Sequence, residues 1–297
     1  MDCCCCGWRC WRQERLNLFS VRALGTVIRR WLAHPLLRGA DIDDPNTLPL
    51  RGQIIQSKLP LKKIYVEWYQ AIAAAVPTGK GLVVEVGCGS GFLRDVLQNV
   101  VATDVFLHSG LHVVLNATHL PLADRSLCGI VMTNVLHHLQ RPRRFFSEAA
   151  RCVRPDGVVV MVEPWTTAWS RVIYRFVHHE PFQPWAANWE SPSSGPMHGA
   201  NQALPWIIFR RDVAQFEQLY PEWRIEKIKP IMPFRYLLSG GVSMRNLMPD
   251  WTFYLWLWLE ELLGPLLGSM AMFAVIILRR VEPRRAAAPP VAGRETN

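Results

Sequence analysis

The sequence predicts an α/β fold in which helices cover both faces of a parallel β-sheet. Three observations favour this class. Short runs rich in Val are mainly apolar, as strands buried on both sides are; examples are Val158–Val162 and, apart from Glu85, Leu82–Val86. Segments with the spacing of helices separate these runs. A polar residue or a turn follows each run, where a strand would end.

Residues 1–60 are predicted to be an N-terminal extension. Between residues 14 and 34 the apolar residues recur mostly three and four apart with Arg on the other side, which predicts a basic amphipathic helix. Such a helix either packs on its own domain or lies on a membrane. Five cysteines crowd the start of the chain without the spacing of a disulfide framework or of zinc ligand pairs, so an acylated tether and a leader without a role both stay open: Cys3, Cys4, Cys5, Cys6 and Cys10.

Helix and strand signals alternate from residue 61. Ile64, Trp68 and Ile72 fall four apart, which predicts a helix over residues 61–76. Further helices are predicted at Phe92–Gln98, at Arg143–Cys152 and over residues 250–267, and Arg154–Gly157 reads as a turn. The predicted strands are Leu82–Val86, Val100–Thr103, His112–Leu115, Gly129–Thr133, Val158–Val162, Arg224–Pro230 and Met270–Leu278.

The charge of the chain lies mainly in its ends. The formal net charge is +9, but residues 1–38 hold seven Arg against two acidic residues, and residues 279–297 hold five Arg against two. A nearly neutral body lacks the basic face that binding to phosphates needs, so a nucleic-acid partner is disfavoured. At 50% hydrophobic residues the chain is not disordered as a whole, although residues 282–297 are predicted to be.

No signal peptide is evident, because Arg22 interrupts the apolar stretch Leu16–Ile28. The expected location is therefore the cytoplasm, with peripheral membrane contact possible through residues 1–38. Leu262–Leu278 is an apolar run of 17 residues. It is expected not to span a membrane, because a span needs about 20 apolar residues.

The sharpest motif is Gly87-Cys88-Gly89-Ser90-Gly91 after the first strand. Glycines there allow a tight turn whose backbone amides face a ligand. The dinucleotide fingerprint places its third glycine one residue later, where this chain has Phe92, so no pyrophosphate cradle is expected.

Around this turn the chain resembles class I S-adenosylmethionine-dependent methyltransferases. The resemblance spans about residues 82–164, agrees in the type and order of its motifs, and is strongest to the small-molecule branch that includes quinone C-methyltransferases. The matching segments are Val83–Phe92, Leu120–Leu127, Val135–Leu139 with Arg141-Pro142, Phe146–Gly157 and Met161–Pro164. The resemblance implies a Rossmann-like sheet of seven strands in the order 3-2-1-4-5-7-6, with the seventh strand antiparallel.

The resemblance also implies S-adenosylmethionine as the cofactor. Asp104 ends the second strand, where its carboxylate can accept hydrogen bonds from the ribose hydroxyls. Asn116 with Ala117 stands where the family usually presents an Asp to the adenine amino group. Glu85 is a charge inside an apolar strand, which water or the amino group of the cofactor could satisfy. The predicted cofactor-binding residues are Glu85, Gly87, Cys88, Gly89, Gly91, Asp104, Asn116, Ala117, Thr133 and Asn134.

His137 and His138 follow the fourth strand, near the place where the methyl group must emerge, and one of them is predicted to be a general base. Glu163, at the end of the fifth strand, is the alternative base. His178-His179-Glu180 and His198 are further candidates. No metal site is predicted; the latter group is disfavoured as metal ligands because adjacent histidines on one element, such as His178 and His179, rarely converge.

The predicted methyltransferase domain covers residues 61–281 and includes an insertion over residues 164–222. Nine of the 13 Trp follow residue 160. These Trp either form a cap over an apolar substrate or fill a small core of the insertion itself. The sequence therefore predicts methyl transfer to a hydrophobic small molecule such as a lipid or a quinone. A protein or nucleic-acid methyltransferase, and a membrane-associated cofactor-binding protein without turnover, are the alternatives.

Overall fold

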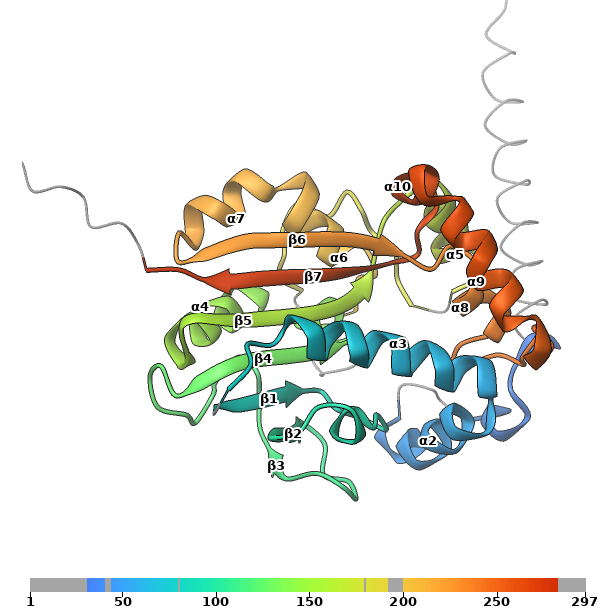
Figure 1. The fold of residues 1–297 in the computed structure, drawn as a ribbon, viewed down its shortest axis with the longest axis horizontal. Coiled ribbons are helices and arrows are strands. Elements are labelled where there is room, and N and C mark those ends of the chain that lie inside the picture. Colours follow the sequence, from blue (N-terminus) through green and yellow to red (C-terminus); the bar gives the residue numbers. More distant parts are fainter. Residues whose placement is uncertain (1–30, 41–43, 80, 179, 192–199, 283–297) are drawn as a thin grey trace, which may run out of the picture.

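The computed structural model describes residues 31–40, 44–79, 81–178, 180–191 and 200–282. Its centre is a sheet of seven strands in the order β3-β2-β1-β4-β5-β7-β6 (Figure 1). Strands β1 to β5 run parallel, and β7 pairs antiparallel with both β5 and β6. This is the sheet that the sequence predicts. The strands are β1 (Leu82–Val86), β2 (Val100–Asp104), β3 (Val113–Val114), β4 (Leu127–Thr133), β5 (Val153–Pro164), β6 (Trp223–Ile231) and β7 (Phe273–Arg280).

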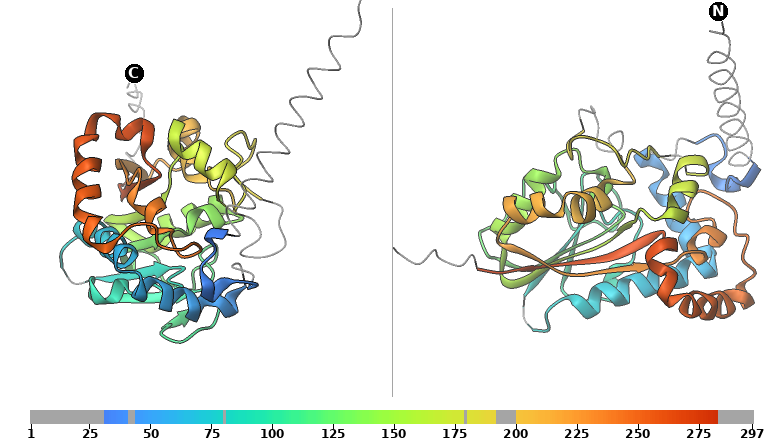
Figure 2. Two further views of the ribbon diagram at one scale, coloured as in Figure 1. Left: turned by 90° about the vertical axis from the view of Figure 1, so that its right-hand side faces the viewer. Right: turned by 90° about the horizontal axis from the view of Figure 1, so that it is seen from above.

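Helices cover both faces of the central strands (Figures 1 and 2). α3 (Leu59–Ala75) lies on one face, where Ile64, Trp68 and Ile72 join a core cluster with Val83, Val131 and Val160. α4 (Pro142–Cys152) and α7 (Val213–Leu219) lie on the other face, where Phe146 and Phe216 pack beside Ile130 and Val159. Alternate side chains of each strand therefore feed two separate clusters, as a covered parallel sheet requires.

The carboxyl ends of the parallel strands point to the side of the molecule that carries the remaining helices (Figure 1). These are α2 (Leu48–Ser57), α5 (Ala168–Phe176), α8 (Arg235–Ser239), α9 (Phe253–Leu262) and α10 (Leu267–Met270). The π-helix η5 (Ile207–Arg211) and α6 (Leu204–Trp206) precede α7. Parallel sheets bind ligands at the carboxyl ends of their strands, so the functional site is expected at this edge.

Two local predictions differ from the structure. Only one 3₁₀ turn, η3 (Leu93–Asp95), stands in place of the helix predicted at Phe92–Gln98, and Asn99 then turns the chain into β2 with a φ of +60°. Arg154–Gly157 lies within β5 instead of forming a separate turn. The pairing of β4 with β5 shifts register at this point, and Asp156 has a φ of +62°, so the sheet absorbs the turn-forming residues as an irregularity.

Leu262–Leu278 is divided between the end of α9, the 3₁₀ turn η7 (Gly264–Leu266), α10 and β7. In the part of the chain that the structure describes, no helix is long and apolar enough to cross a membrane. Most of the predicted basic helix, the cysteines near the N-terminus, His179, His198 and residues 283–297 lie outside the described residues.

Candidate active site

The glycine turn after β1 is held against the end of β2. The backbone N–H of Gly89 donates to Asp104 Oδ2 at 3.0 Å, and the N–H of Cys88 donates to the backbone oxygen of Thr103 at 2.9 Å. Gly87 has a φ of +65°, and a Cβ atom built on it would lie 2.6 Å from Val135 Cγ2. Only glycine fits this position without strain, because it combines a left-handed backbone with close packing.

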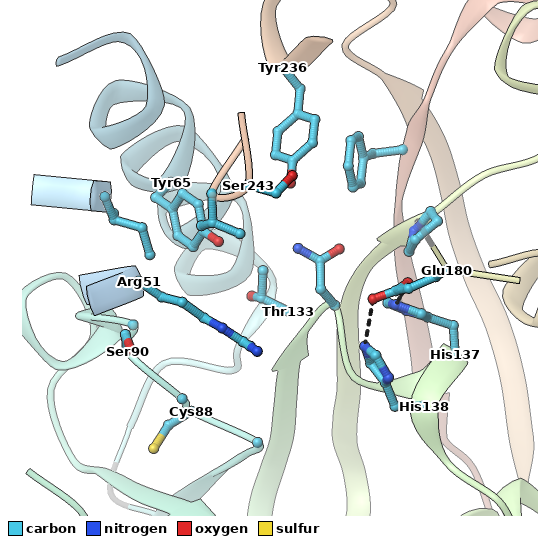
Figure 3. A pocket seen from close by; sticks show the side chains of 18 of the residues that line it. Arg51, Tyr65, Cys88, Ser90, Thr133, His137, His138, Glu180, Tyr236 and Ser243 are labelled. Atoms are coloured by element: carbon cyan, nitrogen blue, oxygen red, sulfur yellow. Dashed lines mark ion pairs between the residues drawn. The ribbon is translucent and has the colours of Figure 1, made fainter. Parts of the chain in front are cut away.

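Two adjoining cavities open on this turn. The first, which we call the Asp104 cavity, has a volume of about 390 Å³ and is lined by Asp104, Asn116 and Ala117. The second, which we call the His137 cavity, has a volume of about 190 Å³ and is lined by Glu85, Thr133 and His137 (Figure 3). Gly87, Gly89, Asn134 and His138 line both cavities. Ten predicted cofactor residues from four strand ends are thus brought together along one continuous groove, with Cys88 and Gly91 on the His137 side.

The Asp104 cavity fits the nucleoside part of the predicted cofactor. Asp104 is 7% exposed, and each carboxylate oxygen accepts one backbone N–H, from Gly89 and from Phe106. One lone pair on each oxygen is therefore left for a ribose hydroxyl. Ala117 is buried and small, which leaves room for a flat ring in the cavity.

Asn116 departs from its expected role. Its Oδ1 accepts hydrogen bonds from both the backbone N–H and the hydroxyl of Thr118, at 2.9 and 2.8 Å. This oxygen has no lone pair left for the adenine amino group, because an amide oxygen accepts two hydrogen bonds. The amide nitrogen of Asn116 is the atom that can still face an adenine, and it can only donate.

Glu85 fits the amino-acid end of the cofactor. Its side chain is buried and lines the His137 cavity. Burial raises the pKa of Glu85 to about 7; the charge of Arg94 opposes this shift and that of Asp104 adds to it. The hydroxyl of Thr103 donates to the backbone oxygen of Glu85, so it does not offset the carboxylate charge. A ligand ammonium in the cavity would do so.

His137 lies at the far end of the His137 cavity, between two carboxylates. Its Nδ1 is 2.7 Å from Glu163 Oε2, and its Nε2 is 3.3 Å from Glu180 Oε2. Burial alone would lower the pKa of His137, but the contacts with Glu163 and Glu180 outweigh it and raise the pKa to about 9. The raised pKa favours the charged form of the His137 imidazole at neutral pH.

Glu163 has a different setting from the one its sequence position suggests. It is fully buried, and its Oε1 accepts the backbone N–H groups of Val135 and Leu136 at 2.7 and 2.8 Å. Its Oε2 faces His137. A carboxylate with three such partners is poorly placed to take a proton from a substrate, so its geometry favours orienting His137.

His138 and Glu180 complete this end of the cavity. His138 Nε2 lies 3.5 Å from Glu180 Oε1, and the imidazole rings of His137 and His138 lie 4.2 Å apart between centroids (Figure 3). Gln202 Nε2 donates to Glu180 Oε2, and the backbone N–H of Glu180 donates to His178 Nδ1. The insertion thus supplies polar groups to the cavity. In the sequence, His178-His179-Glu180 was the signal for polar groups of the insertion near this site. No pattern in the sequence pointed to Gln202.

The Trp side chains of the insertion do not surround the cavities. Trp165 and Trp189 are buried in the core beside α4, whereas Trp185 is 75% exposed. In the described part of the chain, the aromatic residues along the His137 cavity are tyrosines and a phenylalanine: Tyr65, Tyr69, Tyr174, Tyr236 and Phe273. Of the two readings of these Trp, this placement favours packing in the core, with Trp185 at the surface.

Comparison with known proteins agrees with this geometry. Residues 84–161 match the family described as "Methyltransferase domain". Two curated relatives, probable S-adenosylmethionine-dependent methyltransferases of the CDC 1551 and H37Rv strains of Mycobacterium tuberculosis, are each 31% identical, and the match covers 42% of this chain. The chain spans about half the length of these relatives, 52%.

Solved structures have low sequence identity and low structural similarity to this chain. Geranyl diphosphate C-methyltransferase from Streptomyces coelicolor is 12% identical with a TM-score of 0.42, covering 74% of this chain and 81% of its own. A SAM-dependent methyltransferase from Archaeoglobus fulgidus is 15% identical with a TM-score of 0.45, covering 74% and 94%. At such low similarity neither structure speaks to the substrate. Residues 84–161 thus match a methyltransferase domain, and the order of the sheet is the one that the resemblance to class I S-adenosylmethionine-dependent methyltransferases implies.

Proposed function

We propose that this protein transfers the methyl group of S-adenosylmethionine to an oxygen atom of a small, partly apolar molecule held in the His137 cavity. The observation that carries this proposal is the continuity of the two cavities at Gly87 and His138. A cofactor with its ribose at Asp104 would direct its methionine end along the glycine turn. Its methyl group would then face the cluster of His137, His138 and Glu180.

In this proposal the residues of the chain bind and align the cofactor. Asp104 accepts hydrogen bonds from the ribose, Glu85 faces the ammonium group, and Asn116 donates to the adenine, while Thr133 and Asn134 border the methionine end. The cofactor supplies an activated methyl group on a sulfonium. Because charge is lost from sulfur in the transition state, alignment in a site shielded from water is the main contribution of the protein.

The walls of the His137 cavity support an acceptor with two unlike ends. Tyr65 and Tyr236 offer aromatic surface on one side, and His137 with Glu180 offers charged groups on the other (Figure 3). An acceptor with an apolar part and a hydroxyl group suits both. This keeps a lipid or a quinol within the proposed substrate class and disfavours a nucleic acid, which would need a basic face.

Removal of the acceptor proton is the step for which the histidine cluster is suited. A hydroxyl oxygen placed against the imidazole of His137 would meet a cationic group that stabilises its negative charge. Glu163 is not among the residues that line the His137 cavity, so in this proposal it acts through His137, whose imidazole it orients.

The test is methyl transfer from labelled S-adenosylmethionine to an extract of small molecules and lipids, followed by identification of the labelled product. A product that carries the label on oxygen supports the proposal. Label found only on protein or nucleic acid would contradict it, as would a product methylated on carbon or nitrogen. Cofactor binding without any labelled product would favour a binding protein without turnover.

A further inference from the structure

Three side chains with metal-ligating atoms converge at the end of the His137 cavity. His137 and His138 are neighbours in the 3₁₀ turn η4 (Leu136–His138), yet both Nε2 atoms reach the carboxylate of Glu180. The ligating atoms of the three residues all lie within 4.8 Å of one another. The tight turn tilts both imidazole rings toward one residue of the insertion (Figure 3).

The spacing of these atoms is that of ligands around an ion. His137 Nε2 and His138 Nε2 lie 3.3 and 3.5 Å from the two oxygens of Glu180. Charge-assisted hydrogen bonds are shorter, about 2.7–2.9 Å, as the His137–Glu163 pair at 2.7 Å is. In a tetrahedral zinc site with bonds of about 2.0–2.1 Å, neighbouring ligand atoms stand roughly 3.3 Å apart.

The residues behind the cluster are those of a supported metal site. Glu163 accepts from Nδ1 of His137, and two backbone amides hold Glu163 itself. This fixes Nε2 as the atom that faces Glu180. Gln202 holds Glu180 from the other side. A carboxylate on the second nitrogen of a ligating histidine is the usual arrangement around protein-bound zinc.

Charge favours an ion as well. Glu163 and Glu180 are two carboxylates within contact of one imidazole, and Glu163 is fully buried. A divalent cation would balance both carboxylates at the point where they meet His137. Two histidines and one carboxylate with an open fourth position form the ligand set of a catalytic zinc site.

We propose that His137, His138 and Glu180 bind one divalent transition-metal ion of the zinc type, with its open coordination position facing the His137 cavity. The role of the ion rests on the proposed function: it would hold the acceptor oxygen and lower the pKa of its hydroxyl group. The released proton would pass to water, and His138 would serve as a ligand instead of a base.

The second cluster with ligating atoms provides an internal control. Cys88, Asp104 and His108 also lie together, but Asp104 Oδ1 and Oδ2 each accept a backbone N–H, and Asp104 lines the proposed cofactor cavity. His108→Ala therefore tests whether an ion binds at this second cluster instead, and the substitution leaves the His137 cavity intact.

The experiment is equilibrium dialysis of Zn²⁺ against the full chain with Cys3, Cys4, Cys5, Cys6 and Cys10 changed to Ser, so that thiolates near the N-terminus do not compete. We expect one bound ion per chain. His138→Ala and Glu180→Gln should each lower zinc affinity at least about tenfold, and Glu163→Gln roughly 10–100-fold. His108→Ala should leave zinc affinity unchanged.

Calorimetric binding of S-adenosylhomocysteine checks that each variant is folded. Zinc absent from a chain that binds S-adenosylhomocysteine would overturn the site, as would equal zinc affinity in His138→Ala or a loss confined to His108→Ala. The assay involves no methyl transfer. Zinc bound without turnover would therefore defeat only the proposed function, and turnover without bound zinc would defeat only the metal site.

Discussion

His137 and Glu163 share a buried hydrogen bond of 2.7 Å between Nδ1 and Oε2, although 26 residues separate them in the sequence. The bond joins the turn after β4 to the end of β5, neighbouring strands whose carboxyl ends meet at one edge of the sheet. The same carboxylate accepts the backbone amides of Val135 and Leu136. Glu163 therefore fixes both the path of the turn and the orientation of the imidazole.

Glu163→Gln should weaken the contact between the turn after β4 and the end of β5, while the side chain keeps nearly the same size. The variant loses one charge-assisted hydrogen bond, and its amide nitrogen cannot accept the proton of Nδ1. We expect the free energy of unfolding to fall by about 1.5–3 kcal/mol, the range for hydrogen bonds to charged groups. Chemical denaturation measures this change. Glu190→Gln, at an exposed position, is the control, and equal stability of the two variants would contradict the role of Glu163.

Asp104→Ala should weaken cofactor binding. The variant removes the acceptor proposed for the ribose hydroxyls and also releases the N–H of Gly89. We expect affinity for S-adenosylhomocysteine to fall by roughly 1.5–3 kcal/mol by calorimetry. Asp95→Ala, an exposed carboxylate on η3, should bind normally. Unchanged affinity in Asp104→Ala would remove Asp104 from the cofactor site.

Glu85 should make stability and cofactor binding depend on pH in opposite directions. Burial raises its folded pKa from 4.5 to about 7, so the folded chain holds this proton more tightly than the unfolded chain. Its contribution to stability is therefore present below pH 4.5 and is lost as the pH rises through about 7. Cofactor affinity should instead increase over the same range, because the ionised carboxylate attracts the ammonium group.

Glu85→Gln is the matched variant for this prediction, since it keeps the shape and cannot ionise. Denaturation and calorimetry between pH 5 and 8 should show a flatter dependence of both quantities than in the natural chain. Parallel pH curves for the two proteins would show that Glu85 does not titrate in this range.

The strands could be located from the sequence because each carries its own signal, and their order was what the resemblance to the methyltransferase family implied. Val83, Val131 and Val160 are apolar residues of buried strands, and the glycine turn and Asp104 stand directly at strand ends, so topology alone brings them together. The partners of His137 were harder to predict. Glu180 and Gln202 lie in a long insertion without regular periodicity, and only tertiary packing carries them to β4.

Arg154–Gly157 and the Trp residues of the insertion were hard to interpret for the same reason. Arg154–Gly157 has the composition of a turn. Its place within β5 depends on a register shift between β4 and β5, which no rule based on sequence predicts. The Trp residues of the insertion were ambiguous for a related reason. Because Trp side chains are large, any apolar surroundings favour their burial. Composition does not show whether a protein core or a bound substrate provides those surroundings.

His138→Ala should separate the chemical step from cofactor binding. His138 lines the junction of the two cavities and contacts Glu180, and it acts on the acceptor oxygen either as a base or as a metal ligand. Both roles operate in the transition state, so we expect turnover to fall by about 10²-fold or more with nearly unchanged affinity for S-adenosylhomocysteine. His119→Ala, an exposed histidine near the Asp104 cavity, should keep full turnover.

A chelator distinguishes the two roles of His138. If His138 is a metal ligand, chelation should reduce the turnover of the natural chain to that of His138→Ala. If His138 is a base, chelation should have no effect on turnover. Full turnover in a variant that lacks both His137 and His138 would show that neither histidine takes part, and that alignment of the acceptor with the methyl group is sufficient.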